Sequence, residues 1–280
     1  MLILRFYWIF RAFVGNLEFA KLPVPFQLGV TKMKQYEAVI KVMEQNGGYA
    51  TFAHLYQHVL KVPGVEWKTK TPFASMRRIV QDERFFFKIR PGLWALKSHR
   101  HLIPDEMIPT KKETAKQISF THSYYQGLLV QLGNLRNFDT FIPSQDKNKV
   151  FLGKERLGNL TSCKKMYPFT YSQIVSRAQT IDVVWLNSRK MPASVFEVEH
   201  STNMKNALIK FVELQDFRTD MVIVAYETRR KYYDQAISLN AFRPIKNFVT
   251  FWSYEQLSQL HSRTFELKAI QETMQNIRLI

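Results

Sequence analysis

The segment VFEVEHS, residues 195–201, places two carboxylates two residues apart inside an apolar, β-branched run. In a strand, side chains two positions apart point to the same face, so Glu197 and Glu199 are predicted to lie side by side. Phe196 and Val198 would face the other way. Neighbouring carboxylates repel each other unless a cation or a proton lies between them. This face is therefore either open to water or built to hold something positive.

A third acid, Asp182, lies one residue inside the apolar run 181–186, where a charge is unfavourable. If the two runs are paired strands, Asp182 comes near Glu197 and Glu199. Carboxylate oxygens and waters are the ligands that Mg²⁺ prefers, so the three acids are predicted to hold Mg²⁺, with Mn²⁺ able to replace it. A solvated sheet edge is the alternative that the motif alone would favour. The apolar setting and the basic chain favour the metal site.

The elements that must position these acids follow an α/β order. The pattern predicts, in sequence, a helix at 122–135, strands at 138–142, 181–186 and 193–199, a helix at 203–217 and a strand at 221–225. Further predicted elements are a helix at about 228–239, a short strand at 248–251 and helices at the end of the chain. The expected class is α/β (α+β) with a mixed central sheet flanked by helices.

Over residues 119–225, this order and the acids Asp182 and Glu197 resemble the PD-(D/E)xK nuclease superfamily, which has the restriction-endonuclease-like fold. The resemblance implies metal-dependent hydrolysis of a DNA phosphodiester, with Asp182 and Glu197 as metal ligands. It also implies an acid in the first helix, which is absent here. Gln126 is the polar residue at that place, where it could support the site.

The chain departs from the superfamily pattern at Glu199, because the residue two beyond the motif glutamate is usually a lysine that activates water. A minority of restriction endonucleases share this E-x-E form. Three interpretations remain open: Glu199 binds metal or acts as general base, the lysine role has moved to Lys205 in the next helix, or the site is inactive.

The N-terminal part of the chain predicts three helices and a hairpin. The helices are expected at 33–45, 51–60 and 71–80, and the hairpin at 85–96 around Pro91-Gly92. This is the outline of a winged helix-turn-helix. The stretch TPFASMRRIVQDERFFFKIRPGLWAL, residues 71–96, resembles the HARE-HTH family. The resemblance implies DNA binding, with sensing of DNA modification as a further role in the family.

The charge of this region supports DNA binding. Residues 33–100 hold twelve Lys/Arg against five Asp/Glu, and the whole chain carries a net charge of +17 with a pI near 9.9. The residues predicted to contact double-stranded DNA lie at the third helix and the wing: Lys68, Lys70, Arg77, Arg78, Lys88 and Arg90. A protein-docking role for the winged helix is the alternative.

The remaining features set the domain boundaries and the partners. Residues 1–32 are interpreted as an extension or a misassigned start, and Arg5 and Arg11 interrupt their apolar run, so no membrane anchor is expected. The predicted domains are 33–97 (winged helix-turn-helix), 98–118 (linker) and 119–280 (nuclease-like). No Gly-rich phosphate loop occurs, so no nucleotide cofactor is expected. The single cysteine is typical of the cytoplasm.

The leading hypothesis is a Mg²⁺-dependent DNA endonuclease of restriction or phage-defence type. The alternative is a non-catalytic DNA-binding regulator with a degenerate nuclease fold. A homodimer is compatible with either.

Overall fold

The structure is a computed structural model that describes residues 33–201 and 203–277 of the 280-residue chain, all within one compact unit. The interpretation of residues 1–32 lies outside the described residues. The α-helices are α1 (Gln35–Gln45), α2 (Phe52–His58), α3 (Pro72–Ile79), α4 (Ala115–Leu135), α5 (Leu157–Leu160), α6 (Ser172–Ala178), α7 (Lys205–Val212), α8 (Arg230–Ile237) and α9 (Tyr254–Ile277). The strands are β1 (Tyr49–Thr51), β2 (Phe86–Arg90), β3 (Leu93–Leu96), β4 (Asp139–Phe141), β5 (Val150–Phe151), β6 (Glu155–Arg156), β7 (Val183–Leu186), β8 (Pro192–Glu199), β9 (Asp220–Ala225) and β10 (Val249–Ser253).

Residues 33–97, called the N-terminal module below, contain α1–α3 and a three-stranded antiparallel sheet. The predicted hairpin is present as β2 and β3, and β1, which was not predicted, adds to β3 in the order β1-β3-β2. Helix α1 ends where the Gly48 N–H donates to the Met43 carbonyl at 2.7 Å. Gly47 and Gly48 both have positive φ, a conformation that favours glycine.

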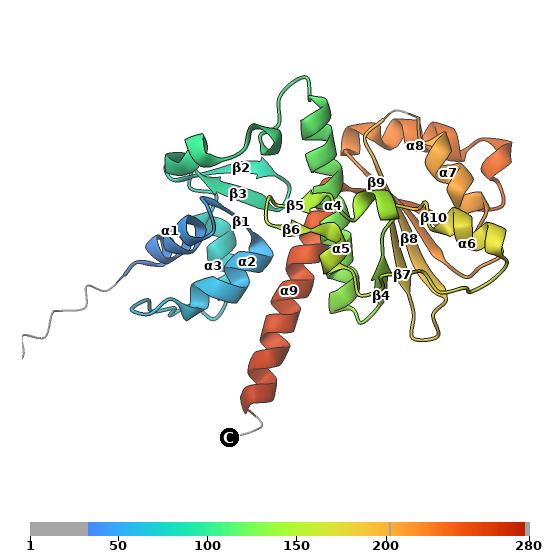
Figure 1. The fold of residues 1–280 in the computed structure, drawn as a ribbon. Coiled ribbons are helices and arrows are strands. Elements are labelled where there is room, and N and C mark those ends of the chain that lie inside the picture. The colour runs from blue at the N-terminus through green and yellow to red at the C-terminus, as the bar shows by residue number, and fades with distance from the viewer. Residues whose placement is uncertain (1–32, 202, 278–280) are drawn as a thin grey trace, which may run out of the picture. The chain divides into compact units, whose positions relative to one another are not determined.

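The second sheet has five strands in the order β10-β9-β8-β7-β4 (Figure 1). The pairs β4–β7 and β7–β8 are antiparallel, whereas β8–β9 and β9–β10 are parallel. The sheet is therefore mixed, as the sequence pattern predicted. Strands β7 and β9 carry near-continuous apolar runs, as expected for strands that are covered by helices on both faces.

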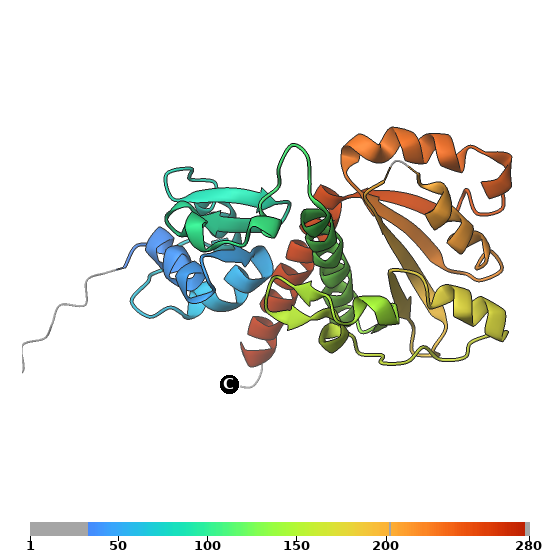
Figure 2. The same ribbon diagram turned by 45° about the horizontal axis from the view of Figure 1, so that its top comes forward.

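Two separate cores pack against this sheet, one on each face (Figures 1 and 2). On one face, α4 and α9 cover alternate strand residues such as Val183, Phe196 and Val198. On the other face, α6, α7 and α8 cover the intervening ones, such as Val184 and Val195. The period of two along β7 and β8 puts Asp182 and Glu197 on the same side as the second set.

Two glycines allow α4 to lie close to its neighbours. A Cβ atom on Gly127 would come within 2.1 Å of the Phe151 ring, and one on Gly133 within 2.6 Å of both Thr140 and Trp185. Real Cβ atoms do not approach other heavy atoms this closely, so each of these contacts requires glycine. The close approach brings the polar residues of α4 within hydrogen-bond distance of the sheet.

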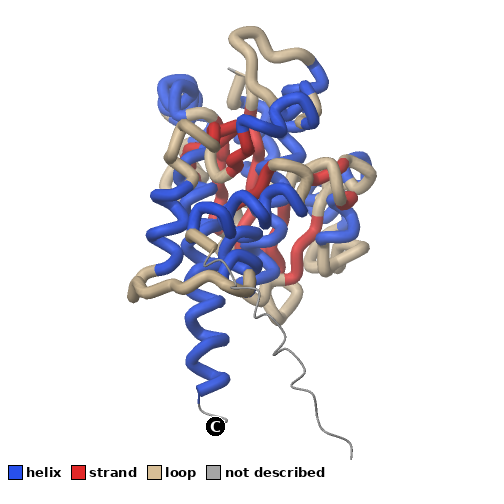
Figure 3. Tube along the Cα trace, turned by 90° about the vertical axis from the view of Figure 1, so that its left-hand side faces the viewer, coloured by secondary structure: helices blue, strands red, loops and turns tan. Residues whose placement is uncertain are grey.

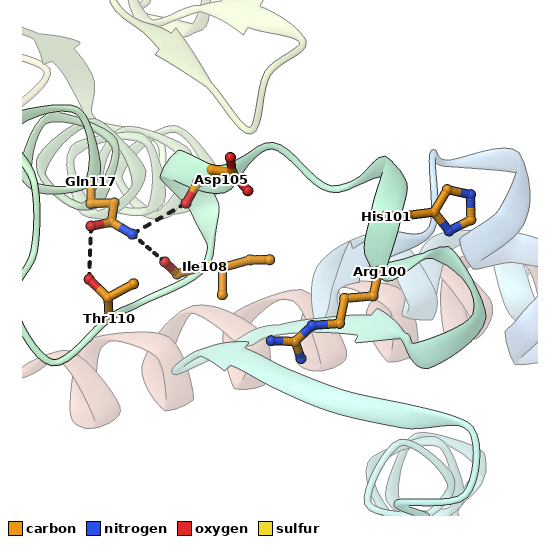
Figure 4. A pocket seen from close by; sticks show the side chains of 6 residues that line it. All are labelled: Arg100, His101, Asp105, Ile108, Thr110 and Gln117. Atoms are coloured by element: carbon orange, nitrogen blue, oxygen red, sulfur yellow. Dashed lines mark hydrogen bonds between the residues drawn. The ribbon is translucent and has the colours of Figure 1, made fainter.

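The segment predicted as a linker is fixed to the N-terminus of α4. Helix α4 begins at Ala115, seven residues earlier than predicted, with Thr114 and Gln117 forming a reciprocal capping box. Figure 4 shows that the Gln117 amide also donates to the carbonyls of Asp105 (3.3 Å) and Ile108 (2.6 Å). Gln117 therefore secures the chain just before α4. The same segment lines a surface pocket of about 620 Å³ that contains none of the acids discussed above.

The N-terminal module is bonded to α4 and α9. The Pro91 carbonyl, at the hairpin turn, accepts hydrogen bonds from Tyr124 of α4 (3.0 Å) and Ser258 of α9 (2.8 Å). Farther along α9, Phe265 and Ala269 pack on the core of the module. The last turns of α9 then run toward the C-terminus clear of the strands (Figure 3). Because the Pro91 carbonyl is hydrogen-bonded to both helices, the turn of the hairpin packs against α4 and α9.

His261 of α9 gives a testable pH dependence. It is buried, its Nε2 lies 2.9 Å from Gln131 Oε1, and burial lowers its pKa to about 3. In the unfolded chain His261 binds a proton below about pH 6.5, whereas in the folded protein it stays neutral, so stability falls as pH falls from there toward 3. Each such group adds a slope of about 1.4 kcal/mol per pH unit. His261→Gln should reduce the slope of denaturant-derived stability between pH 7 and 5, and His101→Gln, at an exposed position, should not.

Candidate active site

Asp182 and Glu197 are held together by reciprocal hydrogen bonds across two strands. The Asp182 N–H donates to Glu197 Oε1 at 3.2 Å, and the Val198 N–H donates to Asp182 Oδ2 at 2.8 Å. Both residues are buried, with exposures of 9% and 3%. The register places Phe196 opposite Val183, so Asp182, just before β7, lies next to Glu197 on β8. The expected meeting of these two acids is therefore present in the fold.

Lys210 of α7 neutralises Glu197. Its Nζ lies 2.8 Å from each Glu197 carboxylate oxygen and also donates to the Thr180 carbonyl at 3.0 Å. The lysine side chain is 24% exposed, so its charge is partly shielded from water. Paired carboxylates repel each other unless a cation lies beside them, and Lys210 supplies that cation.

Lys205, the lysine expected in this helix, lies elsewhere. It is exposed at the start of α7, and its backbone N–H donates to Asn203. If the lysine role has moved to this helix, Lys210, and not Lys205, is the lysine in contact with Glu197. Lys205 and Lys210 are five positions apart, a rotation of about 140° around a helix, so only one of them can face Glu197.

His122 of α4 contacts Asp182 from the opposite side. Its Nε2 lies 3.1 Å from Asp182 Oδ2, and its Nδ1 lies 3.1 Å from Gln126 Oε1. The Gln126 amide nitrogen donates to Asp146 Oδ2 at 2.7 Å and to the Asp182 carbonyl at 3.1 Å, which leaves its oxygen to accept. Both ring nitrogens of His122 thus face acceptors, and the imidazolium form satisfies both bonds.

Gln126, which the sequence suggested as a possible support of the site, lies within a buried polar network. It is fully buried and bonds His122, Asp146 and the backbone of Asp182. Asp146 is itself paired with Lys149 at 2.6 Å. A continuous polar network therefore joins the surface lysine, the interior of α4 and the first acid of the site.

Glu199 lies at the edge of this arrangement. It is the last residue of β8, half-buried, and accepts a hydrogen bond from Ser201 at 3.1 Å. Its backbone carbonyl accepts from Tyr254 at 3.3 Å, and the Tyr254 hydroxyl also lies 3.3 Å from the ring of His200. His200 is thus within hydrogen-bond distance of Tyr254. Its ring centroid is 5.9 Å from that of His122.

Burial and neighbouring charges separate the pKa values of the acids. Burial and the charge of Asp182 raise the pKa of Glu197 well above its usual range, against the opposing effect of Lys210. Burial also raises the pKa of Asp182, but bonds from His122 and the Val198 N–H outweigh it and lower the net value. Burial raises the pKa of Glu199. Such divergent shifts in one cluster are typical of functional sites.

The donor types suit a hard divalent cation, but the present arrangement does not form a metal centre. Across residues 33–201 and 203–277, no group of three or more His, Cys, Asp or Glu side chains is placed to hold a metal ion. In the present arrangement Lys210 contacts both oxygens of Glu197, and His122 contacts Asp182. Mg²⁺ binding by Asp182, Glu197 and Glu199 stays a prediction.

The residues predicted to contact DNA divide into two groups. Lys68, Lys70, Arg78 and Lys88 are exposed. Arg90 is buried, which corrects the prediction for that residue, and Arg77 is half-buried, with 22% of its side chain exposed. Arg77 donates to Tyr56 and to Glu266 of α9, and Arg90 is 3% exposed.

The sequence did not predict a place in the site for His122, Asp146, Lys149 or Lys210. One available signal was the spacing of His122 and Gln126, four residues apart and therefore on one face of a helix. For Lys210 the signal was its spacing of three residues from Ala207, which makes the two neighbours on the surface of a helix. Neither signal is specific, because the sequence does not show which face of each helix packs against the acids.

Residues 102–277, more than half of the chain, match the family described as "Type II restriction enzyme NmeDI C-terminal domain", and the chain belongs to this family. It is 25% identical over 178 residues to Type II restriction enzyme NmeDI of Neisseria meningitidis serogroup C. The match covers 58% of this chain and 50% of the relative, so the chain spans about half the length of that protein.

The predicted relation to restriction endonucleases is confirmed at this level. No solved structure matches the chain. Within the described residues, no helix combines the length and apolar composition needed to cross a membrane.

Proposed function

We propose that the protein is a metal-dependent DNA endonuclease of restriction type, in which the N-terminal module acts as a winged helix-turn-helix. The observation that carries the proposal is the buried cluster of Asp182, Glu197 and Lys210, in a member of a restriction-enzyme family. Acids on two neighbouring strands with a lysine against them provide charges suited to a phosphodiester and its nucleophile. The superfamily lysine would then be supplied by α7.

The roles of the residues follow from their contacts. Asp182, Glu197 and Glu199 would hold Mg²⁺, which when bound activates water and offsets charge on the scissile phosphate. Lys210, released from one Glu197 oxygen, would donate to a phosphate oxygen as negative charge develops there. His122 and Gln126 fix the side chain and the backbone of Asp182, so that this carboxylate is oriented before substrate binds.

A non-catalytic DNA-binding regulator is the second candidate. Glu199 stands where the motif usually has lysine, and Lys210 engages both oxygens of Glu197. A fold whose acids are permanently neutralised in this way would bind DNA without cutting it.

Cleavage assays separate the two candidates. Full-length protein should cut plasmid or genomic DNA, plain or carrying modified bases, in Mg²⁺ or Mn²⁺ and not in chelator. Glu213→Gln, at an exposed residue at the end of α7, should cut like the wild type. If the protein binds DNA tightly but cleaves no substrate in either metal, it is the non-catalytic regulator.

DNA binding is expected to depend on the exposed cations beside and within α3. The double substitution Lys70→Gln, Arg78→Gln should weaken duplex binding about tenfold or more at 0.1 M salt and reduce the slope of log K against log salt by about one per lost phosphate contact. Arg84→Gln, at an exposed arginine paired with Asp82, serves as the matched control. Equal losses in both variants would assign binding to another surface.

A further inference from the structure

Arg90 is a buried cation with a specific set of partners. It lies on β2 of the N-terminal module and is 3% exposed. Its Nη1 donates to Glu113 Oε1 and to the Tyr226 hydroxyl, both at 3.1 Å, and the Tyr226 hydroxyl lies 3.3 Å from the same Glu113 oxygen. The guanidinium lies 5.6 Å from the centroid of the Phe120 ring. Arg90, Glu113 and Tyr226 form one closed cluster, called the Arg90 triad below.

The Arg90 triad is a costly way to fill a core. A charge removed from water needs full compensation, and replacing a buried ion pair with apolar residues is often neutral or stabilising. Here the Arg90 Nε and Nη2 atoms are also buried, and no partner for them lies within the described residues. Stability alone does not account for an arginine at this place.

The triad joins three segments that are far apart in sequence. Arg90 belongs to the module, Glu113 precedes α4 in the segment secured by Gln117, and Tyr226 directly follows β9. Ala225, the last residue of β9, is the register partner of Glu199. The Tyr226 ring packs at 4.7 Å on Tyr254, whose hydroxyl bonds the Glu199 carbonyl. Two side chains therefore connect Arg90 to the backbone of the candidate site.

We infer that Arg90 is a positioning residue that sets the distance between the DNA-reading surface of the module and the acids that cut. The inference rests on the proposed function. Phosphates of one DNA strand follow each other every ~3.4 Å along the helix axis, so a module displaced by that distance would present a neighbouring phosphodiester to Asp182 and Glu197. If the module is held in one position, cleavage occurs at a constant distance along the DNA from the sequence that the module binds.

The experiment uses full-length Arg90→Met and Tyr226→Phe. Both should spread the cleavage positions, mapped to single nucleotides on an end-labelled duplex, onto neighbouring phosphodiesters. They should also lower the rate at the wild-type position about tenfold, while DNA affinity changes less than about twofold. Tyr233→Phe is the matched control, because it removes one buried hydrogen bond, to the Val249 carbonyl, on the other face of the sheet. The control should lower the melting temperature without moving the cut.

A second readout does not depend on cleavage. Spin labels at Glu83→Cys in the module and Glu213→Cys on the sheet domain, both exposed, should give a narrow distance distribution that broadens in Arg90→Met and Tyr226→Phe. Cys163 is buried and can be replaced by serine in all variants. An unchanged distribution in both variants overturns the inference. If the distance distribution broadens but the protein cuts no DNA, Arg90 does hold the module in place, and the proposed nuclease function is wrong.

Discussion

Glu197→Gln is expected to lower the rate of DNA cleavage by a factor on the order of 10³ or more while changing DNA affinity by less than about threefold. The substitution keeps the shape of the side chain and removes the negative charge that Lys210 contacts and that Mg²⁺ would require. DNA affinity should be preserved because it depends on exposed cations far from this buried position. Single-turnover cleavage in Mg²⁺ and gel-shift binding in chelator measure the two quantities separately.

The competing possibility for this variant is a structural effect. Glu197 accepts the Asp182 N–H, and glutamine can still accept that bond through its amide oxygen. Glutamine also turns an amide NH₂ toward Lys210 and leaves that lysine without its counter-charge, so unfolding in denaturant must be measured alongside the rate of cleavage. A variant that still cuts at more than about a tenth of the wild-type rate would remove Glu197 from the proposed mechanism.

Lys210→Met is expected to slow cleavage by about 10²–10³-fold, and Lys205→Met by less than about threefold. The structure sets this contrast, because Lys210 contacts Glu197 and Lys205 is exposed at the start of the same helix. Methionine keeps the length of the side chain and removes the charge. The pair forms its own control, since both substitutions remove one positive charge from α7.

Other outcomes of the lysine experiment are equally informative. A large loss in Lys205→Met with a small one in Lys210→Met would restore the original assignment of the displaced lysine. Small losses in both, with a large loss in Glu199→Gln, would make Glu199 the activating group. Lys210→Met also leaves Glu197 buried without its partner, so the stability of this variant must be measured alongside its rate.

The sequence predicted the parts of the site that depend on local pattern. Alternation along β8 places Glu197 on one face, and the apolar run after Asp182 identifies the neighbouring strand. Both depend only on the period of two in a strand. The mixed sheet followed from the order of helices and strands, although β1 and the start of α4 did not.

The remaining parts depend on packing between distant segments. Whether Lys205 or Lys210 faces Glu197 is decided by the rotation of α7 about its axis, which tertiary contacts set. Arg77 and Arg90 looked available for DNA because their partners, Glu266 and Glu113, lie in α9 and before α4. No local pattern contains that information.

The glycines of α4 have a practical consequence. Gly133→Ala would gain about 1 kcal/mol of helix propensity but force a methyl group against Trp185, and overpacking of this kind costs about 1–3 kcal/mol. The net loss of up to about 2 kcal/mol would lower the melting temperature by roughly 2–4 °C for each kcal/mol. Because the proposed activity would damage the DNA of any cell that makes the protein, a heat-labile variant offers a way to produce it: the host grows with the enzyme inactive, and lowering the temperature restores it.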